Sequence, residues 1–197
     1  MITVAIQAGG RSNRMGRDKA LLPLGGKPLI EHVLQRVAGL GDDVLITTNR
    51  PDDYAFLGLR MVGDRQPGAG ALDGLLTALE AARSDRVLLL ACDMPFVSRP
   101  LLDHMVGIDS EADVVIPRRG GRLQPLHAIY AASCAASVRE ALNAGEKRMI
   151  SFLPSVQTLI VEQEILDQYD PNGLSFFNVN TPDDLVQAEQ TLSTLGF

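Results

Sequence analysis

Short apolar runs alternate with segments of helical periodicity along this chain, beginning at its first residues. In residues 28–40, for example, the apolar side chains fall on one face of a helix. Segments of this kind predict helices over residues 28–40, 72–82, 133–144 and 182–195. The apolar runs predict strands over residues 2–6, 44–48, 60–62, 86–91, 113–116, 126–130 and 158–161.

The last predicted helix has clear start signals. Thr181 is the expected N-cap, and Pro182 follows it at the first helical position. Asp183 and Asp184 then place negative charge in the first turn, where the helix dipole favours it.

Continuously apolar strands separated by helices indicate a parallel sheet that is covered on both faces. Because no linker, repeat or low-complexity stretch interrupts the chain, we predict an α/β fold in one domain over residues 1–197, with a mostly parallel sheet. Such sheets bind ligands beyond the carboxyl ends of their strands. Candidate sites therefore follow Ile6, Thr48, Val62 and Ala91.

Composition narrows the possible functions. A formal net charge of −6 at pH 7 argues against a nucleic-acid-binding protein. No apolar run approaches the ~18 residues that span a bilayer, and the first residues lack the basic leader of a signal peptide. We therefore expect a cytoplasmic protein without a membrane partner. Cys92 and Cys134 lack metal-type spacing, and with three histidines in the chain a zinc site is not expected.

The first candidate site is the glycine-rich, basic loop at residues 8–19. Gly9 and Gly10 leave backbone N–H groups open to a phosphate, with no side chain in between. The loop contains one anionic residue, Asp18, and four cationic residues, Arg11, Arg14, Arg17 and Lys19. On an acidic protein this local charge suits a triphosphate. The alternative is a solvated turn, since the loop matches neither the P-loop nor the dinucleotide pattern.

The second candidate is Asp93, two residues beyond the most apolar predicted strand. A carboxylate at a strand end beside a triphosphate is suited to bind Mg²⁺. Alternatively, Asp93 caps a helix that begins near Ser98, although it stands early in the sequence for that role.

Two further segments leave their interpretation open. Residues 64–74 are glycine-rich, and Gly68 and Gly70 precede a predicted helix whose N–H groups can face a phosphate or a base edge. Residues 118–127 are basic, and form either an anion site or a solvated hairpin turn with His127 entering a strand.

The loop Ala8-Gly9-Gly10-x-Ser12-x-Arg14-Met15-Gly16-x-Asp18-Lys19 resembles the signature loop of the molybdenum cofactor guanylyltransferases. Cys92-Asp93-x-Pro95 is similar to the magnesium motif of that family, and Asn178-x-Asn180-Thr181-Pro182 is similar to its late motif. The resemblance spans nearly the whole chain. It implies a Rossmann-like, three-layer fold of the nucleotide-diphospho-sugar transferase type.

The resemblance also implies a reaction, in which GMP passes from GTP to the terminal phosphate of molybdopterin, or of its molybdenum form, and pyrophosphate leaves. Mg²⁺ is the implied cofactor, with Asp93 as its ligand. Catalytic roles are expected for Lys19, Arg14 and Asp93. The expected nucleotide site comprises Gln7, Ala8, Gly9, Gly10, Lys19, Thr47, Asn49, Asp64, Gly68, Gly70 and Asp93. The expected acceptor site comprises Arg118, Arg119, Arg122, Asn178 and Asn180.

The chain departs from the family pattern at three positions. Gln7 stands where Leu is usual. Either its amide hydrogen-bonds to the base or the ribose, or Gln7 is only a polar residue at the end of a strand. Asp73 is an additional carboxylate that either accepts from guanine N–H groups or faces solvent. Thr47 stands where Asn is often found.

Three other functions stay open at this point. A molybdopterin cytidylyltransferase or a sugar-phosphate nucleotidyltransferase would share the fold and mechanism, although Gly9-Gly10 and Asp18-Lys19 favour guanine. A non-catalytic nucleotide-binding carrier would deliver the cofactor to an apo-enzyme. Transient contact with other cofactor-biosynthesis proteins or apo-molybdoenzymes is a further expectation.

Overall fold

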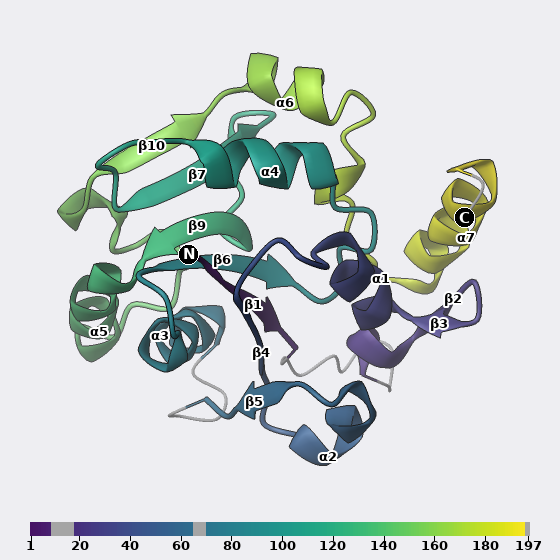
Figure 1. Cartoon of the computed structure of the whole chain (residues 1–197), viewed down its shortest axis with the longest axis horizontal. Helices are drawn as coiled ribbons and strands as arrows, with labels where there is room; N and C mark the ends of the chain where they lie inside the picture. Colours follow the sequence, from purple (N-terminus) through teal and green to yellow (C-terminus); the bar gives the residue numbers. More distant parts are fainter. Residues whose placement is uncertain (9–17, 65–69, 196–197) are drawn as a thin grey trace.

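The computed structural model describes residues 1–8, 18–64 and 70–195, and Figure 1 shows the arrangement of its helices and strands. The strands are β1 (Thr3–Gln7), β2 (Pro23–Leu24), β3 (Lys27–Pro28), β4 (Asp43–Thr47), β5 (Arg60–Val62), β6 (Arg86–Ala91), β7 (Val114–Arg119), β8 (Arg122–Leu123), β9 (His127–Ala131) and β10 (Thr158–Val161). The helices are α1 (Leu29–Arg36), α2 (Pro51–Tyr54), α3 (Ala71–Ala81), α4 (Arg99–Gly107), α5 (Ala135–Asn143), α6 (Gln163–Tyr169) and α7 (Pro182–Leu195).

The main sheet has the strand order β10-β7-β9-β6-β1-β4-β5, with β8 paired to β7. β1 pairs in parallel with β4 and β6, β4 with β5, and β7 with β10. β9 runs antiparallel to both of its neighbours, β6 and β7. The mostly parallel sheet expected from the apolar strands is therefore confirmed.

Helices cover both faces of this sheet. Val4 and Ile6 of β1 pack with residues of α1 and α4 on one face, whereas Ala5 packs with residues of α3 on the other. The same alternation holds from Val87 to Leu90 of β6, as the two-residue period of a strand requires. Figure 1 shows α3 and α5 together on one side of the sheet and α4 and α6 on the other. These are the three layers that the sequence predicts.

A smaller apolar cluster joins the end of the chain to its beginning. α7 places Ala188 and Leu192 against Leu22 and Leu24, beside the β2–β3 hairpin, and Val179 lies in the same cluster. At the start of α7, the Asp184 backbone N–H donates to Thr181 Oγ1 over 3.2 Å, and Asp184 Oδ2 accepts from the Thr181 N–H over 2.8 Å. This reciprocal capping confirms Thr181 as the N-cap.

All seven predicted strands are present, six of them to within one residue at both ends, whereas β7 continues three residues beyond the predicted end at Ile116. Two predicted helices are too long. The helix expected over 28–40 ends at Arg36, and Val37 leaves the helical conformation with φ −95° and ψ 2°. Gly39 then takes a positive φ of 69°, which continues the turn. The helix expected over 133–144 begins instead with a 3₁₀ turn, Ala132–Cys134, and α5 follows it.

Among the described helices, none is long and apolar enough to cross a membrane.

Candidate functional site

The carboxyl ends of the central strands meet at one edge of the sheet. Gln7 ends β1 and lies opposite both Thr47 of β4 and Ala91 of β6. Beyond the strands, the Ala8 N–H donates to the Thr47 carbonyl over 2.9 Å, and the Cys92 N–H donates to the Gln7 carbonyl over 3.2 Å. The segments that the sequence singles out after β1, β4 and β6 therefore start side by side.

Three chain segments bring Lys19, Asp93 and Asn180 together at this edge. Lys19 Nζ donates to Asn180 Oδ1 over 2.5 Å and lies 3.8 Å from Asp93 Oδ2. A backbone hydrogen bond joins the segments of Asp93 and Asn180, because the Val179 N–H donates to the Asp93 carbonyl over 3.0 Å. Residues separated by up to 161 positions thus form one charged cluster.

Asp93 holds its carboxylate in a largely desolvated position. Burial raises its pKa above the ordinary value, and the Lys19 ammonium opposes that shift. The helix-cap alternative is excluded, because the cap of α4 is Ser98, whose Oγ accepts from the Leu101 N–H over 3.4 Å. The Asp93 side chain is left facing Lys19.

Asp18 anchors the residue that precedes Lys19. Its Oδ1 accepts from the Ala20 N–H over 3.1 Å, and its Oδ2 accepts from the Tyr54 hydroxyl over 2.5 Å and from the Arg50 guanidinium. Tyr54 is fully buried, and burial raises the pKa of its hydroxyl far above the ordinary value. Sequence reasoning did not identify Tyr54 or Arg50, because no local pattern links α2 to a loop more than 30 residues earlier.

Gln7 turns its amide toward the first turn of α3. Its Nε2 donates to the Ala71 carbonyl over 3.2 Å, while its Oε1 is buried and has no hydrogen-bond partner in the described part of the chain. Gly74 makes this contact possible, because a Cβ there would lie 2.0 Å from Gln7 Nε2. Asp73, on the same helix, is only 3% exposed, so the solvent-facing alternative for its carboxylate is excluded.

Asn49 and Asp64 are joined by two hydrogen bonds. Asn49 Nδ2 donates to Asp64 Oδ2 over 2.8 Å, and the Asp64 N–H donates to Asn49 Oδ1 over 2.9 Å. Burial raises the pKa of Asp64, and the negative charge of Asp73 raises it further, against the effect of the Asn49 bond. Thr47, predicted with them, is buried, and its hydroxyl has no partner among residues 1–8, 18–64 and 70–195.

The basic segment after β7 is divided between two environments. Arg118 forms a two-pronged ion pair with Glu162, with Nε 3.1 Å from Oε2, so its charge is largely compensated. Arg119 instead places its guanidinium over the Phe176 ring, 5.5 Å from the ring centroid. Arg122 is exposed on β8, in the hairpin that the sequence suggested as an alternative.

Asn178 and Asn180, predicted to act together, have different partners. Asn178 Nδ2 donates to the Phe176 carbonyl over 3.0 Å, whereas Asn180 binds Lys19. Asn180 therefore belongs with the Lys19–Asp93 cluster as well as with the predicted acceptor side.

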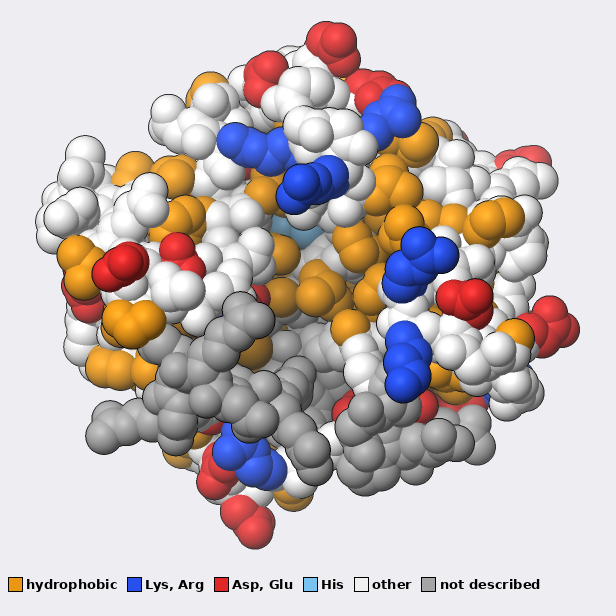
Figure 2. Space-filling model, turned by 180° about the vertical axis from the view of Figure 1, so that it is seen from behind, with side chains coloured by type: hydrophobic (Ala, Val, Ile, Leu, Met, Phe, Trp, Pro, Cys, Tyr) orange, Lys and Arg blue, Asp and Glu red, His pale blue; other side chains and the backbone are white. Residues whose placement is uncertain are grey.

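His127 also lies at this edge, at the start of a strand, as the hairpin alternative predicts. It is fully buried at the start of β9, opposite Leu90 of β6, and its ring centroid lies 5.0 Å from that of Phe176. Figure 2 shows a hollow near the centre of one face, with hydrophobic side chains on its floor and Lys and Arg side chains on its rim. A surface of this kind suits an anionic ligand with a planar or apolar body.

Some predicted residues lie outside the described part of the chain, namely Gly9, Gly10, Arg14 and Gly68. Gly70 is described, and its φ of 97° is one that glycine adopts readily at the start of α3. No group of three or more His, Cys, Asp or Glu side chains suited to a metal occurs within the described residues. Asp93 alone can still fit Mg²⁺, which keeps several waters and takes one or two carboxylates together with substrate phosphates.

Comparison with known proteins gives a consistent result. The MobA-like NTP transferase domain family matches residues 4–158. A protein of Pelotomaculum thermopropionicum described as "Probable molybdenum cofactor guanylyltransferase" is 40% identical over 94% of this chain and 91% of its own length. The crystal structure of molybdopterin-guanine dinucleotide biosynthesis protein A from Archaeoglobus fulgidus superposes with a TM-score of 0.84 at 30% identity, covering 98% of this chain and 99% of that one.

A more distant structure shares the fold alone. The 2-C-methyl-D-erythritol 4-phosphate cytidylyltransferase of Thermus thermophilus gives a TM-score of 0.69 at 22% identity, covering 96% of this chain and 98% of that one. The expected nucleotide-diphospho-sugar transferase fold is thereby confirmed.

Proposed function

This chain belongs to the MobA-like NTP transferase family, and from that membership we propose that it transfers GMP from GTP to the terminal phosphate of molybdopterin. The product is a guanine dinucleotide of the cofactor, and pyrophosphate leaves. Relatives at 31–40% identity along most of their length carry the name molybdenum cofactor guanylyltransferase, which supports this assignment.

The acceptor needs no general base. A phosphate monoester with a second pKa of about 6 is already mostly dianionic at neutral pH. One of its oxygens forms a bond to the α-phosphorus of GTP, and the bond from that phosphorus to the bridging oxygen of pyrophosphate breaks. The enzyme contributes positioning and compensation of charge along this in-line path.

Lys19, Asp93 and Asn180 carry the proposal, because the structure brings them together from three segments at the carboxyl edge of the sheet. Lys19 stabilises charge on the phosphates, and Arg14 is proposed to assist it. Asn180 and Asp93 hold the Lys19 ammonium in place. Asp93 would hold Mg²⁺, which supplies charge neutralisation and polarises the α-phosphate.

The nucleotide is proposed to lie along the ends of β1, β4 and β5. Gly9 and Gly10 would receive the phosphates through their backbone N–H groups, and Gly68 and Gly70 are proposed to contact the nucleotide as well. Ala8 is proposed to contact the nucleotide without its N–H, which donates to the Thr47 carbonyl. Gln7, Thr47, Asn49 and Asp64 would then face base and ribose. Gln7 Oε1 and Thr47 Oγ1 are buried without a partner among the described residues, which supports this placement, since buried polar atoms ordinarily have partners.

The acceptor is proposed to bind across β6, β9 and the segment before α7. Arg119 and Arg122 are the candidates for its phosphate, together with Asn178 and Asn180. Arg118 acts mainly through its ion pair with Glu162. We also propose that residues 1–197 act as one domain, because β10, which begins at the last matched residue, and α7, which lies beyond the match, pack onto the same body. Contact with apo-molybdoenzymes and a cytoplasmic location stay predictions.

Isotopic labelling tests this assignment. GTP labelled at the α-phosphate is incubated with Mg²⁺, the protein and molybdopterin, and the products are separated. Label in a molybdopterin dinucleotide, with one unlabelled pyrophosphate released for each dinucleotide formed, is the expected result. Label that stays in GTP, although the protein binds both substrates, would instead identify a non-catalytic carrier.

A further inference from the structure

His127 is a buried histidine that the proposed reaction does not use. It opens β9, opposite Leu90, at the edge of the sheet where β6 delivers Asp93. Strand alternation places its side chain on the same face as Ile129, which packs in the cluster that includes α4 and α6 residues. The imidazole therefore lies beneath the acceptor side of the proposed site.

The His127 ring is an exception among the polar groups around it. Neither ring nitrogen has a hydrogen-bond partner in the described part of the chain, although the residue is fully buried. On the same strand, the buried Tyr130 hydroxyl donates to the Pro125 carbonyl over 2.7 Å. Elsewhere, His32 Nε2 lies 2.8 Å from the Leu24 carbonyl. An unpaired buried polar group is costly, so a partner for His127 is expected from beyond the described residues, and a bound ligand is the candidate developed below.

Burial also determines what that partner must offer. It lowers the pKa of His127 to about 3, so the imidazole is neutral at physiological pH. A neutral imidazole has one N–H donor and one lone-pair acceptor. A ligand that satisfies both ring nitrogens must offer one acceptor and one donor. The edge of a heterocyclic ring that carries both kinds of group meets this requirement.

The residues over His127 suit the same kind of ligand. The half-buried Phe176 ring stands 5.0 Å from His127 at 52°, and the Arg119 guanidinium covers Phe176. Gly173 leaves room for that cation, because a Cβ there would lie 1.7 Å from both terminal nitrogens of Arg119. Phe176 ends the short 3₁₀ turn Leu174–Phe176, which leads directly to Asn178 and Asn180. An aromatic face beside a cation favours a planar ring with an anionic tail.

We propose that His127 is the floor of the acceptor site and hydrogen-bonds to the ring system of a pterin-type acceptor, with Phe176 as the side chain that moves aside to admit it. The acceptor class rests on the proposed function. His127 and Phe176 would select the ring, whereas Arg119 would attract the phosphate.

Steady-state kinetics with two variants test this role. His127→Leu removes both ring nitrogens and keeps an apolar side chain, so KM for molybdopterin should rise about tenfold, as expected for one lost hydrogen bond. KM for GTP should stay unchanged, and Tm should be equal or higher, because an unsatisfied polar group is gone. His127→Gln keeps a donor and an acceptor and should recover part of the acceptor affinity. An unchanged KM for molybdopterin, or equal rises in both KM values, would overturn the proposal.

A measurement on the unaltered protein does not depend on how a variant folds. The chain has three histidines, so ¹⁵N-histidine labelling gives a simple imidazole spectrum. Addition of pterin, which lacks the phosphate, should shift the His127 ring resonances; a spectrum in which they do not move contradicts the proposal. If the wild-type protein fails to turn over molybdopterin with GTP, the proposed function is wrong, and the pterin titration still decides the role of His127.

Discussion

Asp93 carries its carboxylate in a position where burial makes the ionised form less favourable than it is in water. Burial raises its pKa, and the Lys19 ammonium only partly offsets that effect. In the unfolded chain the carboxyl returns to its ordinary pKa. A carboxyl group whose pKa is higher in the folded state lowers the free energy of unfolding at any pH where it is ionised in both states. This cost becomes smaller as the pH falls through the pKa of the folded state. Such a cost is expected of a residue that is shaped for a ligand.

Asp93→Asn should therefore separate activity from stability. Loss of the carboxylate is expected to lower kcat by about 100-fold or more, the effect of removing several kcal/mol of charge stabilisation. At pH 7 the free energy of unfolding of the ligand-free protein should rise, and the difference from wild type should narrow as pH is lowered toward 4. Urea unfolding at several pH values measures this.

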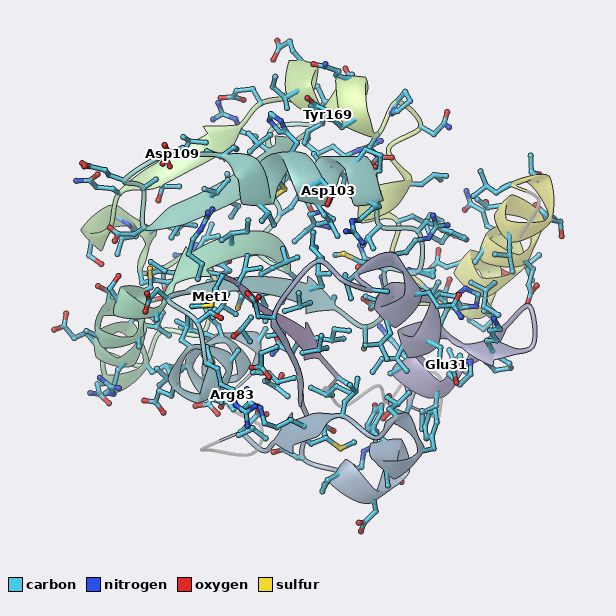
Figure 3. All side chains as sticks on the ribbon, in the orientation of Figure 1. Met1, Glu31, Arg83, Asp103, Asp109 and Tyr169 are labelled. Atoms are coloured by element: carbon cyan, nitrogen blue, oxygen red, sulfur yellow. The ribbon has the colours of Figure 1, made fainter. Side chains whose placement is uncertain are left out.

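The matched control is Asp109→Asn. Asp109 is exposed beyond α4, at the opposite end of the molecule from α7 in Figure 3, and the change should leave kcat and its Mg²⁺ dependence unaltered. Near-full turnover by Asp93→Asn with Mg²⁺ and GTP would show that Asp93 is not the metal ligand.

Sequence motifs a few residues long were sufficient to predict some of the site residues. Lys19 and Asp93 follow directly from cations and a carboxylate placed after apolar strands. Their neighbours could not be found in this way, since Tyr54 reaches Asp18 across 36 positions. His127 looked like an ordinary strand residue, because sequence alone does not show that both ring nitrogens end without a partner.

The contact between β1 and α3 depends on the absence of one side chain. A Cβ at Gly74 would meet the buried Gln7 amide, with 2.0 Å to Nε2 and 2.8 Å to Cδ. Gly74→Ala should displace that amide from the Ala71 carbonyl and raise KM for GTP several-fold. In a Gln7→Ala background the same change should be neutral or stabilising by up to about 1 kcal/mol, because Ala is the better helix former.

A double-mutant cycle measures this coupling through urea unfolding and KM for GTP. If Gly74→Ala has the same effect with and without Gln7, the clash with Gln7 is not its cause.

α2 holds the 3₁₀ turn Lys19–Leu21 (η1) in place through Asp18. Tyr54→Phe removes the hydroxyl that donates to the Asp18 carboxylate, and should cost about 2 kcal/mol, as expected for a hydrogen bond to a charged group. Because Lys19 follows Asp18, kcat should also fall several-fold. Thermal unfolding and turnover report the two effects.

Tyr169→Phe is the comparison for that prediction. The Tyr169 ring stacks on His104, with centroids 4.5 Å apart, and lies on α6 on the other side of the molecule from α2 (Figure 3). The Tyr169→Phe change also removes one hydroxyl, but turnover and stability should stay close to those of the wild type. Equal losses in the two variants would argue against a special role for the Tyr54–Asp18 bond.

At the scale of elements, apolar periodicity located the strands well because each has a nearly continuous apolar run. Helix ends were harder to predict. Leu34 and Val37 continue the apolar face of α1, yet the chain turns at Val37 to reach β4. α2, with four residues, and α6, with seven, are too short to give a periodic signal.

For the whole molecule, the sequence predicted the fold class but not the strand order. That β9 inserts antiparallel between β6 and β7, and that β10 pairs with β7, depends on tertiary packing across distant segments. This order is what brings His127 and the 176–180 segment to the edge where Lys19 and Asp93 lie. The proposed acceptor side therefore emerges only from the assembled sheet.

The central claim is guanylyl transfer to molybdopterin, and a donor comparison tests it most directly. Purified protein, Mg²⁺ and molybdopterin are supplied with GTP, CTP or ATP, and pyrophosphate release is followed together with dinucleotide formation. We expect kcat/KM for GTP to exceed that for CTP and ATP by about 100-fold, a difference of about 3 kcal/mol in transition-state binding. A preference for CTP would contradict the guanylyl assignment, and absence of release with all three donors would contradict nucleotidyl transfer itself.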